Sequence, residues 1–394
     1  MALTLLVTDR NLNILGAPLA GWTKLTCELN FNAPASGSVP LPAHPEYMAL
    51  LQPGNRMVLI RDGSIWCAGP MEKPQTYTWD LDDNAGPGAV LVTWSDDLAR
   101  VAGYLTYPEP AKAFTAQTTT TDVVRQITST NAETVIRTLV DENCGPGALA
   151  ARRIERLVLD DVAGVGSTVS VSTRFEPLLD ACRTAAATDG LGFRTRQVGD
   201  QILFGVYAPV DRTATARFSA GLGNLRSVGF DLSAPLATSE LVQGGNDPKQ
   251  EASEGEPVPA RVYLEVESGA AADWYRVEKL QDKTGTTDDS QGELTQAGTL
   301  ALGDDNPHAG LSTVTVDTPA LRAGVDYGLG DRVTVVLPTG LEVADVVQTI
   351  RLEATPDDGE LVTTVVGNSD QTTTTATVRA VRDLARRLGR LEAR

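Results

Sequence analysis

The chain has 394 residues, which is more than one compact core usually holds, so we expect two to four packed units. Hydrophobic residues make up 42% of it, and no apolar run is long enough to cross a bilayer, which excludes membrane insertion. The net charge of −18 argues against nucleic-acid binding as the main task, because phosphate backbones require a basic face.

Residues 1–95 predict an N-terminal tube-like β-barrel domain, because short alternating segments are separated by turn residues such as Pro53-Gly54 and Asp62-Gly63. The first segment alternates like a strand and has no basic region before a long apolar stretch, so we expect no secretion signal. The predicted strands are Leu3 to Thr8, Leu25 to Asn32, Met57 to Arg61, Ile65 to Met71, Thr76 to Leu81 and Val90 to Trp94.

Residues 96–225 predict a mixed α/β domain, because the apolar period changes to that of helices. Strands are expected at Leu191 to Val198 and Gln201 to Tyr207, joined by the tight turn Gly199-Asp200. The predicted helices are Asp122 to Thr130, Glu133 to Asn143 and Phe175 to Thr188.

Residues 226–367 return to strands and predict a second tube-like β-barrel domain, with one helix near Gly292 to Leu302. The segment 246–259 is acidic and rich in proline, so we expect an exposed loop there that faces solvent or a partner.

A short internal repeat relates the two β-rich regions. Gly54-Asn55-Arg56 is followed by an apolar strand, and so is Gly330-Asp331-Arg332. Glycine supplies a turn with positive φ and Asn or Asp bonds the turn backbone, which is a sensible way to open a barrel hairpin. The alternative is coincidence, since any β-rich chain contains such turns.

Residues 368–394 predict a linker and a C-terminal amphipathic helix. The seam Val381, Leu384, Leu388 and Leu391 has coiled-coil spacing, and six arginines give the last 16 residues a net charge of +4. This helix could contact an oligomer or a partner, or it could pack on its own domain. The whole chain is thus predicted to be mainly β, with two tube-like β-barrel domains, an α+β middle domain and a C-terminal helix.

Signals for chemistry are absent. The two histidines, His44 and His308, lie beside prolines outside any motif, and we expect no catalytic residues, metal or cofactor. The cysteines Cys27, Cys67, Cys144 and Cys182 lack metal-ligand spacing and predict reduced, mostly buried thiols. Adjacent acids such as Asp96-Asp97 are interpreted as solvated turns, although a glycosidase that uses two distant acids is a minor alternative.

Several short motifs together resemble a known family. They are Phe31-Asn32-Ala33-Pro34, Ser38-Val39-Pro40-Leu41-Pro42, Gly54-Asn55-Arg56 with Gly69-Pro70, Ser172 to Leu179, Tyr207-Ala208-Pro209, Phe218-Ser219 and Leu329 to Val333. The pattern resembles the siphophage minor tail proteins of phages that infect actinobacteria, within the wider class of tail hub, or Tal-like (baseplate hub), proteins. The resemblance covers about residues 1–367.

The resemblance implies a non-enzymatic protein of the virion tail tip, assembled in the host cytoplasm. It implies a homotrimer whose two tube-like domains per chain form a pseudo-hexameric ring that closes or extends the tail tube. Duplication within a chain is what such a ring requires. The implied neighbours are a distal tail protein or the tail tube above and tip or fibre proteins below, with DNA and tape measure protein only in transit.

Two other functions stay open on sequence grounds. Aromatic residues in a β-rich chain can stack on sugars, so a carbohydrate- or receptor-binding tail adhesin is one alternative, with Trp66, Trp79, Trp94 and Trp274 as candidate platforms. The other is the hub of a contractile injection system, which shares the architecture and differs in its partners.

Overall fold

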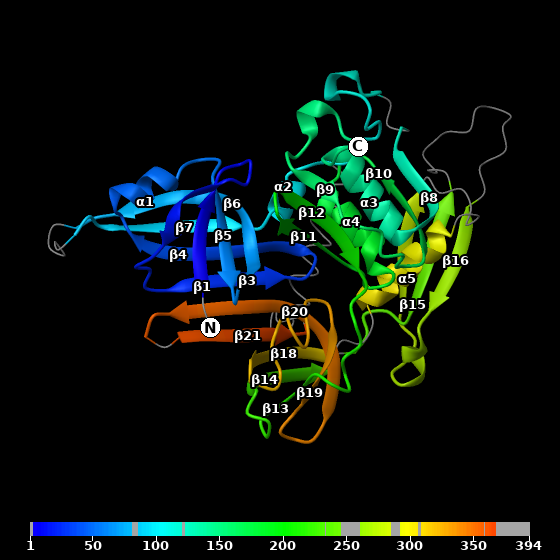
Figure 1. The fold of residues 1–394 in the computed structure, drawn as a ribbon. Coiled ribbons are helices and arrows are strands. Elements are labelled where there is room, and N and C mark those ends of the chain that lie inside the picture. Colours follow the sequence, from blue (N-terminus) through cyan, green and yellow to red (C-terminus); the bar gives the residue numbers. More distant parts are fainter. Residues whose placement is uncertain are drawn as a thin grey trace.

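The computed structural model describes residues 3–80, 86–119, 123–232, 234–245, 261–284, 292–305, 309–357 and 359–367. Strands predominate in these residues, which confirms the prediction of a mainly β chain (Figure 1). The acidic loop 246–259, His308 and the C-terminal segment 368–394 lie outside the described residues. None of the described helices is long and apolar enough to span a membrane.

The N-terminal unit is a seven-stranded antiparallel arrangement in the order β2-β1-β5-β6-β7-β4-β3. Its elements are β1 (Leu3–Thr8), β2 (Ile14–Leu19), β3 (Leu25–Asn30), β4 (Ala33–Pro42), α1 (Pro45–Leu50), β5 (Arg56–Arg61), β6 (Ser64–Thr78), β7 (Ala89–Ser95) and α2 (Leu98–Ala102). The two strands predicted at 65–71 and 76–81 are one strand, β6, which continues through register shifts between Met71 and Thr76. Alternation buries Val39 and Leu41 of β4 and turns Ser36 and Ser38 outward.

The C-terminal unit has the order β14-β18-β21-β20-β19-β13. Its strands are β13 (Arg217–Ser219), β14 (Leu225–Leu232), β18 (Ala309–Val316), β19 (Arg332–Val336), β20 (Glu342–Thr355) and β21 (Gly359–Val366). Most pairs are antiparallel, and β13 joins β19 in parallel. Strand β20 has three neighbours: residues 342–346 pair with β19, and residues 349–354 pair with β21 on one edge and with β3 on the other.

The two units share one sheet. β3 pairs antiparallel with β20, so that Cys27 lies opposite Leu352 and a 13-stranded sheet results. A single buried apolar core runs through both units. The expectation of two β-barrel domains is not met by closed barrels: among the described residues no ladder joins β2 to β3 within the N-terminal unit or β14 to β13 within the C-terminal unit.

The middle of the chain forms a separate α/β core. Its elements are η1 (Phe114–Ala116), β8 (Arg125–Asn131), α3 (Ala132–Asn143), η2 (Ala150–Arg152), β9 (Leu157–Leu159), β10 (Thr168–Thr173), α4 (Leu178–Ala187), β11 (Gly192–Val198) and β12 (Gln201–Tyr207). The helices predicted at 133–143 and 175–188 and the hairpin around Gly199 are confirmed. The helix predicted at 122–130 is wrong. That segment is mostly β8, whose β-branched residues favour a strand and which pairs with β10.

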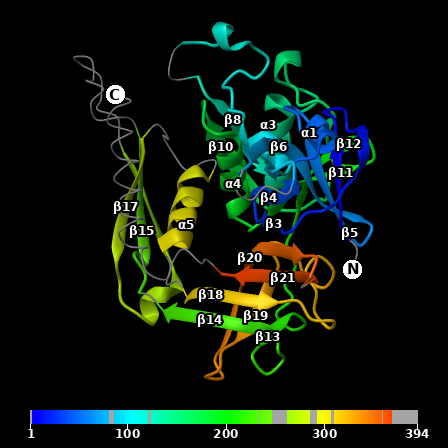
Figure 2. The ribbon, with the colours of Figure 1, turned by 90° about the vertical axis from the view of Figure 1, so that its left-hand side faces the viewer.

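A third sheet is inserted between β14 and β18. It contains β15 (Ser239–Gly245), β16 (Val262–Glu267) and β17 (Glu278–Thr284), with η3 (Gly269–Ala272) between β16 and β17. Helix α5 (Glu293–Asp305) follows β17, which confirms the helix predicted near 292–302. Helix α5 lies between this sheet and the middle domain (Figure 2). Gly298 allows the close approach, because a Cβ there would lie 2.5 Å from Val266 Cγ2.

Candidate assembly interface

The sequence repeat has a counterpart in strand topology. In the N-terminal unit the order β5-β6-β7-β4-β3 matches β19-β20-β21-β18-β14 of the C-terminal unit. The registers match as well: Arg56 lies opposite Pro70, and Arg332 lies opposite Val346. The two units are therefore two versions of one arrangement of five strands.

The glycines of the repeat make the turns that open β5 and β19. Gly54 has φ of +86° and Gly330 has φ of +84°, a region that favours glycine. Asn55 Nδ2 donates a hydrogen bond to the carbonyl oxygen of Leu50 at 2.7 Å. Asp331 accepts one from the backbone N–H of Gly328 at 2.9 Å. The polar residue thus bonds the local backbone in both turns.

The third residue of the repeat differs between the units. Arg56 is buried, forms an ion pair with Asp97 and donates to Gln197 Oε1 at 2.9 Å, so it ties the N-terminal unit to the middle domain. Arg332 is exposed. In the C-terminal unit Asp331 accepts from Arg212 Nε at 2.9 Å, which holds the turn against the segment that joins β12 to β13. Sequence reasoning treated these residues only as turn residues and missed both attachments, because the partners are distant in the chain.

The junction between the units is made of strand β3 against strand β20. Beyond the ladder, Thr349 Oγ1 donates to Asn30 Oδ1 at 3.0 Å, and the N–H of Phe31 donates to the carbonyl oxygen of Gln348 at 2.9 Å. Leu352 is fully buried in this junction. The junction is therefore part of the core as well as a backbone contact.

A buried arginine fixes the two units beside this junction. Arg61, at the end of β5, is 9% exposed, pairs with Glu360 of the C-terminal unit and lies 3.8 Å from Asp317 Oδ2. Its guanidinium also stacks on Trp66 at 4.7 Å from the ring centroid. Burial raises the pKa of Asp317, and Arg61 opposes that rise. Arg61 therefore compensates two carboxylates that come from the other unit.

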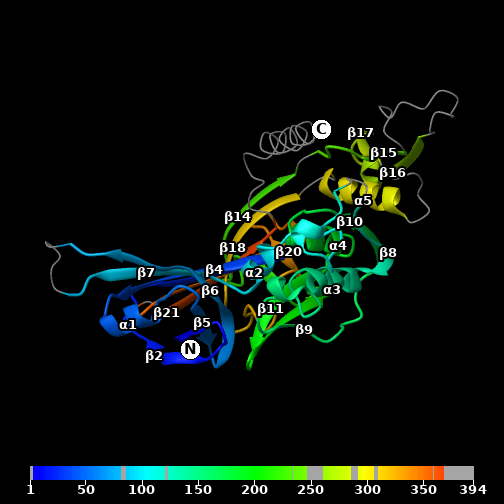
Figure 3. The same cartoon turned by 90° about the horizontal axis from the view of Figure 1, so that it is seen from above.

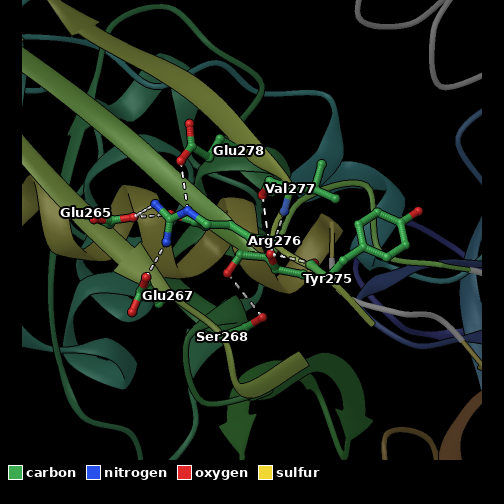
Figure 4. Close-up of polar contacts among 9 residues, drawn as sticks. Glu265, Glu267, Ser268, Tyr275, Arg276, Val277 and Glu278 are labelled. Carbon is green, nitrogen blue, oxygen red and sulfur yellow. Dashed lines mark hydrogen bonds and ion pairs between the residues drawn. The ribbon is translucent and has the colours of Figure 1, made fainter. Parts of the chain in front are cut away.

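A second arginine cluster is exposed. Arg276 bonds Glu265, Glu267 and Glu278 on the open face of the β15–β17 sheet, as Figure 4 shows. The contacts with Glu278, Glu265 and Glu267 raise the pKa of the arginine. All four side chains stay in contact with water, so screening weakens these ion pairs.

The acid pair Asp96-Asp97 is not the solvated turn that the sequence predicts. Asp97 is 3% exposed beside Arg56. Asp96 Oδ1 accepts from the backbone N–H of Ala35 at 3.1 Å, and burial raises the pKa of Asp96 to about 7, helped by the charge of Asp97. This pair joins the end of β7 to the start of α2.

Among the described residues, no three His, Cys, Asp or Glu side chains gather to hold a metal ion. His44 precedes α1 and contacts Tyr47. The prediction of four free, buried cysteines is confirmed. The proposed sugar platform is wrong for Trp94, which is 1% exposed and lies against Gly37.

The fold is that of phage tail proteins. A 43 kDa tail protein of prophage MuSo2 from Shewanella oneidensis has a TM-score of 0.59 at 12% identity, with 93% of this chain and 99% of that chain covered. The tail protein from Neisseria meningitidis MC58 has a TM-score of 0.54 at 11% identity, covering 93% and 96%. Prophage tail protein gp18 from Listeria monocytogenes EGD-e has a TM-score of 0.53 at 9% identity, covering 97% and 99%.

The family is defined more narrowly by sequence. Residues 4–368 match the family described as Siphovirus ReqiPepy6 Gp37-like protein, and the chain belongs to it. No curated protein is similar enough in sequence to match. The chain therefore belongs to a siphovirus family and has the fold of prophage tail proteins, in line with the resemblance to siphophage minor tail proteins.

Replacing Arg61 with Met should lower the free energy of unfolding by about 3–5 kcal/mol, because Glu360 and Asp317 would be left buried without their cation. Urea unfolding followed by tryptophan fluorescence measures the change. Arg276→Met is the matched control, and its exposed carboxylates should leave stability nearly unchanged. Equal losses in the two variants would contradict a special role for Arg61.

Asp96 should make stability depend on pH. In the folded protein its pKa is about 7, whereas in the unfolded chain it returns to about 3.8, so between these values the folded state keeps a proton that the unfolded state has lost. Stability should therefore fall as pH rises from 4 to 7, by at most about 1.4 kcal/mol per pH unit.

Asp96→Asn should remove this slope and should unfold at a higher temperature than the wild type at pH 8, because the amide oxygen can still accept from Ala35. Melting temperatures between pH 4 and pH 8 test it, with the exposed Glu46→Gln as control. If the wild type and Asp96→Asn have the same slope, Asp96 is not the titrating group.

Proposed function

We propose that this protein is a structural hub of a siphophage tail tip, which works as a homotrimeric, pseudo-hexameric ring that closes or extends the tail tube. The observation that carries the proposal is the duplicated five-strand arrangement, joined edge to edge within one chain by β3 and β20. Three copies of a duplicated chain present six similar units, which matches a threefold component to a sixfold tube.

The face of the sheet that points away from the core supports the proposal. Its side chains are mostly uncharged, and include Thr26, Ser36, Ser38, Thr93 and Thr363. Its cations include Lys24 and Arg351, which lie 3.4 and 2.8 Å from the carboxylate of Glu353, and Lys73, which lies opposite Thr93. In a ring this face would line the channel, and a surface with few free cations would hold DNA weakly as it passes.

The role that we propose is structural and not enzymatic, in keeping with membership of a siphovirus family and with a fold similar to that of prophage tail proteins. The protein would be part of the virion tail tip and would assemble in the host cytoplasm. Its neighbours would be a distal tail protein or the tail tube above, and tip or fibre proteins below. DNA and tape measure protein would pass through the channel without stable binding.

The alternative of a carbohydrate-binding adhesin has weaker support. Trp94 is buried, and Trp66 is covered by the guanidinium of Arg61, so two of the candidate aromatic platforms are unavailable to a sugar. Trp79 is 55% exposed, but it directly follows β6, whose 71–78 half pairs on one edge only among the described residues and is a candidate for contact with another copy of the chain. The hub of a contractile injection system would have the same architecture and other neighbours.

Electron cryomicroscopy of the purified protein and of tail particles tests the ring. We expect threefold class averages with six lobes around a channel, because each chain would contribute two similar units. Light scattering during gel filtration gives the mass in solution. A monomer or a solid elongated trimer, also within tail particles, would contradict the hub and favour a peripheral adhesin.

The C-terminal seam of Val381, Leu384, Leu388 and Leu391 is proposed as a further oligomer or partner contact. Replacing Leu384 and Leu388 by Asp should weaken assembly and leave each chain folded, because charges would enter the apolar seam. Gel filtration and circular dichroism measure the two effects. Arg382→Ala with Arg386→Ala, outside the seam, is the control. Unchanged assembly of the Leu384 and Leu388 variant would rule out the seam.

A further inference from the structure

The duplication defines which strands of the two units are equivalent, residue by residue. Strands β20, β21, β18 and β14 of the C-terminal unit are neighbours in that order, and they correspond to β6, β7, β4 and β3 of the N-terminal unit. The paired residues along the two series show which positions are equivalent. In these series Val228 of β14 occupies the place of Cys27 of β3. Tyr77 of β6 occupies the place of Leu352 of β20, and both lie opposite equivalent residues of the next strand.

Within the chain only one of the two possible junctions is made. β3 lies against β20, whereas the equivalent strands β14 and β6 are far apart in the sheet order. Among the described residues, β14 is an end strand and the 71–78 half of β6 pairs only with β7. Figure 3 shows the β6–β7 hairpin extending away from the middle domain, and its outer end carries no covering element. Each chain thus forms the β3–β20 pairing, and it also presents the equivalent strands β14 and β6 without pairing them to each other.

The side chains of β20 at the β3–β20 junction are buried, whereas the equivalent side chains at the edge of β6 are exposed. Leu352 is 0% exposed, but its counterpart Tyr77 is 52% exposed. Ala354 is 3% exposed, and its counterpart Trp79 is 55% exposed. Large aromatic side chains therefore stand in water at the positions that the internal junction buries. An unpaired strand with exposed apolar residues is a site for pairing with another strand.

We propose that β14 of one copy pairs antiparallel with residues 76–79 of the next copy, with Tyr77 opposite Val228. The inference rests on the proposed ring and names its contact. Tyr77 and Trp79 would then pack over Val228 and Leu225, which are only partly buried in the single chain. The partner is a second copy of the chain, because β14 and β6 are equivalent to β3 and β20, which already pair with each other within one chain.

The proposed contact also explains how the open sheet ends. Along the path β14-β18-β21-β20-β3-β4-β7-β6, each copy contributes eight strands, and the last strand meets the first strand of the next copy. Strands β5, β1 and β2 continue beyond β6, and β19 and β13 branch from β20, so they would lie outside this path. The path through the copies then has no free edge.

Engineered cysteine pairs test the register. Tyr77→Cys with Val228→Cys and the adjacent pair Thr78→Cys with Ser227→Cys occupy neighbouring positions, of which one is a non-hydrogen-bonded pair with Cα atoms about 4.5 Å apart. We expect oxidation of at least one of them to join most chains covalently on non-reducing gels. The four native cysteines are buried, which limits background. Ile14→Cys with Val228→Cys is the control, since Ile14 is 64% exposed on β2, away from the proposed contact.

The outcomes separate this inference from the ring itself. A trimer that forms no cross-link with either pair, or cross-links equally with the Ile14 control, overturns the β14–β6 contact and leaves the ring standing. A protein that is monomeric alone and in tail particles overturns both.

A second variant does not depend on disulfide geometry. Tyr77→Asp with Trp79→Asp changes side chains that are already exposed in the single chain, so the melting temperature should stay close to that of the wild type. The trimer should dissociate at concentrations at least about tenfold higher than for the wild type, since every 1.4 kcal/mol lost changes the dissociation constant tenfold. An unchanged dissociation constant in a folded variant overturns the contact.

Discussion

The antiparallel pairing of β3 with β20 is the contact on which the rest of the structure depends. It joins residues 319 positions apart, Asn30 and Thr349, and turns two small β units into one sheet with one core. Forming such a contact costs the intervening chain conformational entropy, because its distant ends must meet. The middle domain and the β15–β17 sheet are insertions whose positions follow from where this junction holds the two units.

Buried arginines determine how the units are oriented around that junction. Arg56 is paired with Asp97 and linked to the middle domain, and Arg61 is paired with Glu360 of the C-terminal unit. Removing two charges from water costs several kcal/mol per ion, so such pairs add little net stability compared with apolar packing. They do penalise every arrangement in which the partners are separated. Their main effect here is therefore to select one orientation of the units.

Local patterns in the sequence predicted local structure well. Helix α3 and the hairpin at Gly199 depend on periodicity and turn chemistry within a few residues. Strand β4 was missed because its prolines and serines are typical of loops, although its pairing with β3 and β7 overrides that preference. Closed barrels were predicted wrongly because strand pairing is set by the whole fold. The burial of Asp97 had no local signal either, since its partner lies 41 positions away.

The internal junction also limits how copies of the chain can assemble. A head-to-tail contact produces a closed ring if its rotation divides a full turn, and an open filament if it does not. In this chain the rotation between the two units is fixed within the fold by β3, β20 and Arg61. In the proposed ring, a contact between copies that repeats the same strand pairing would repeat the same rotation, so one covalent chain would carry the geometry of the assembly. Duplication thus gives control over closure that a chain with a single unit would have to obtain from its intermolecular contacts alone.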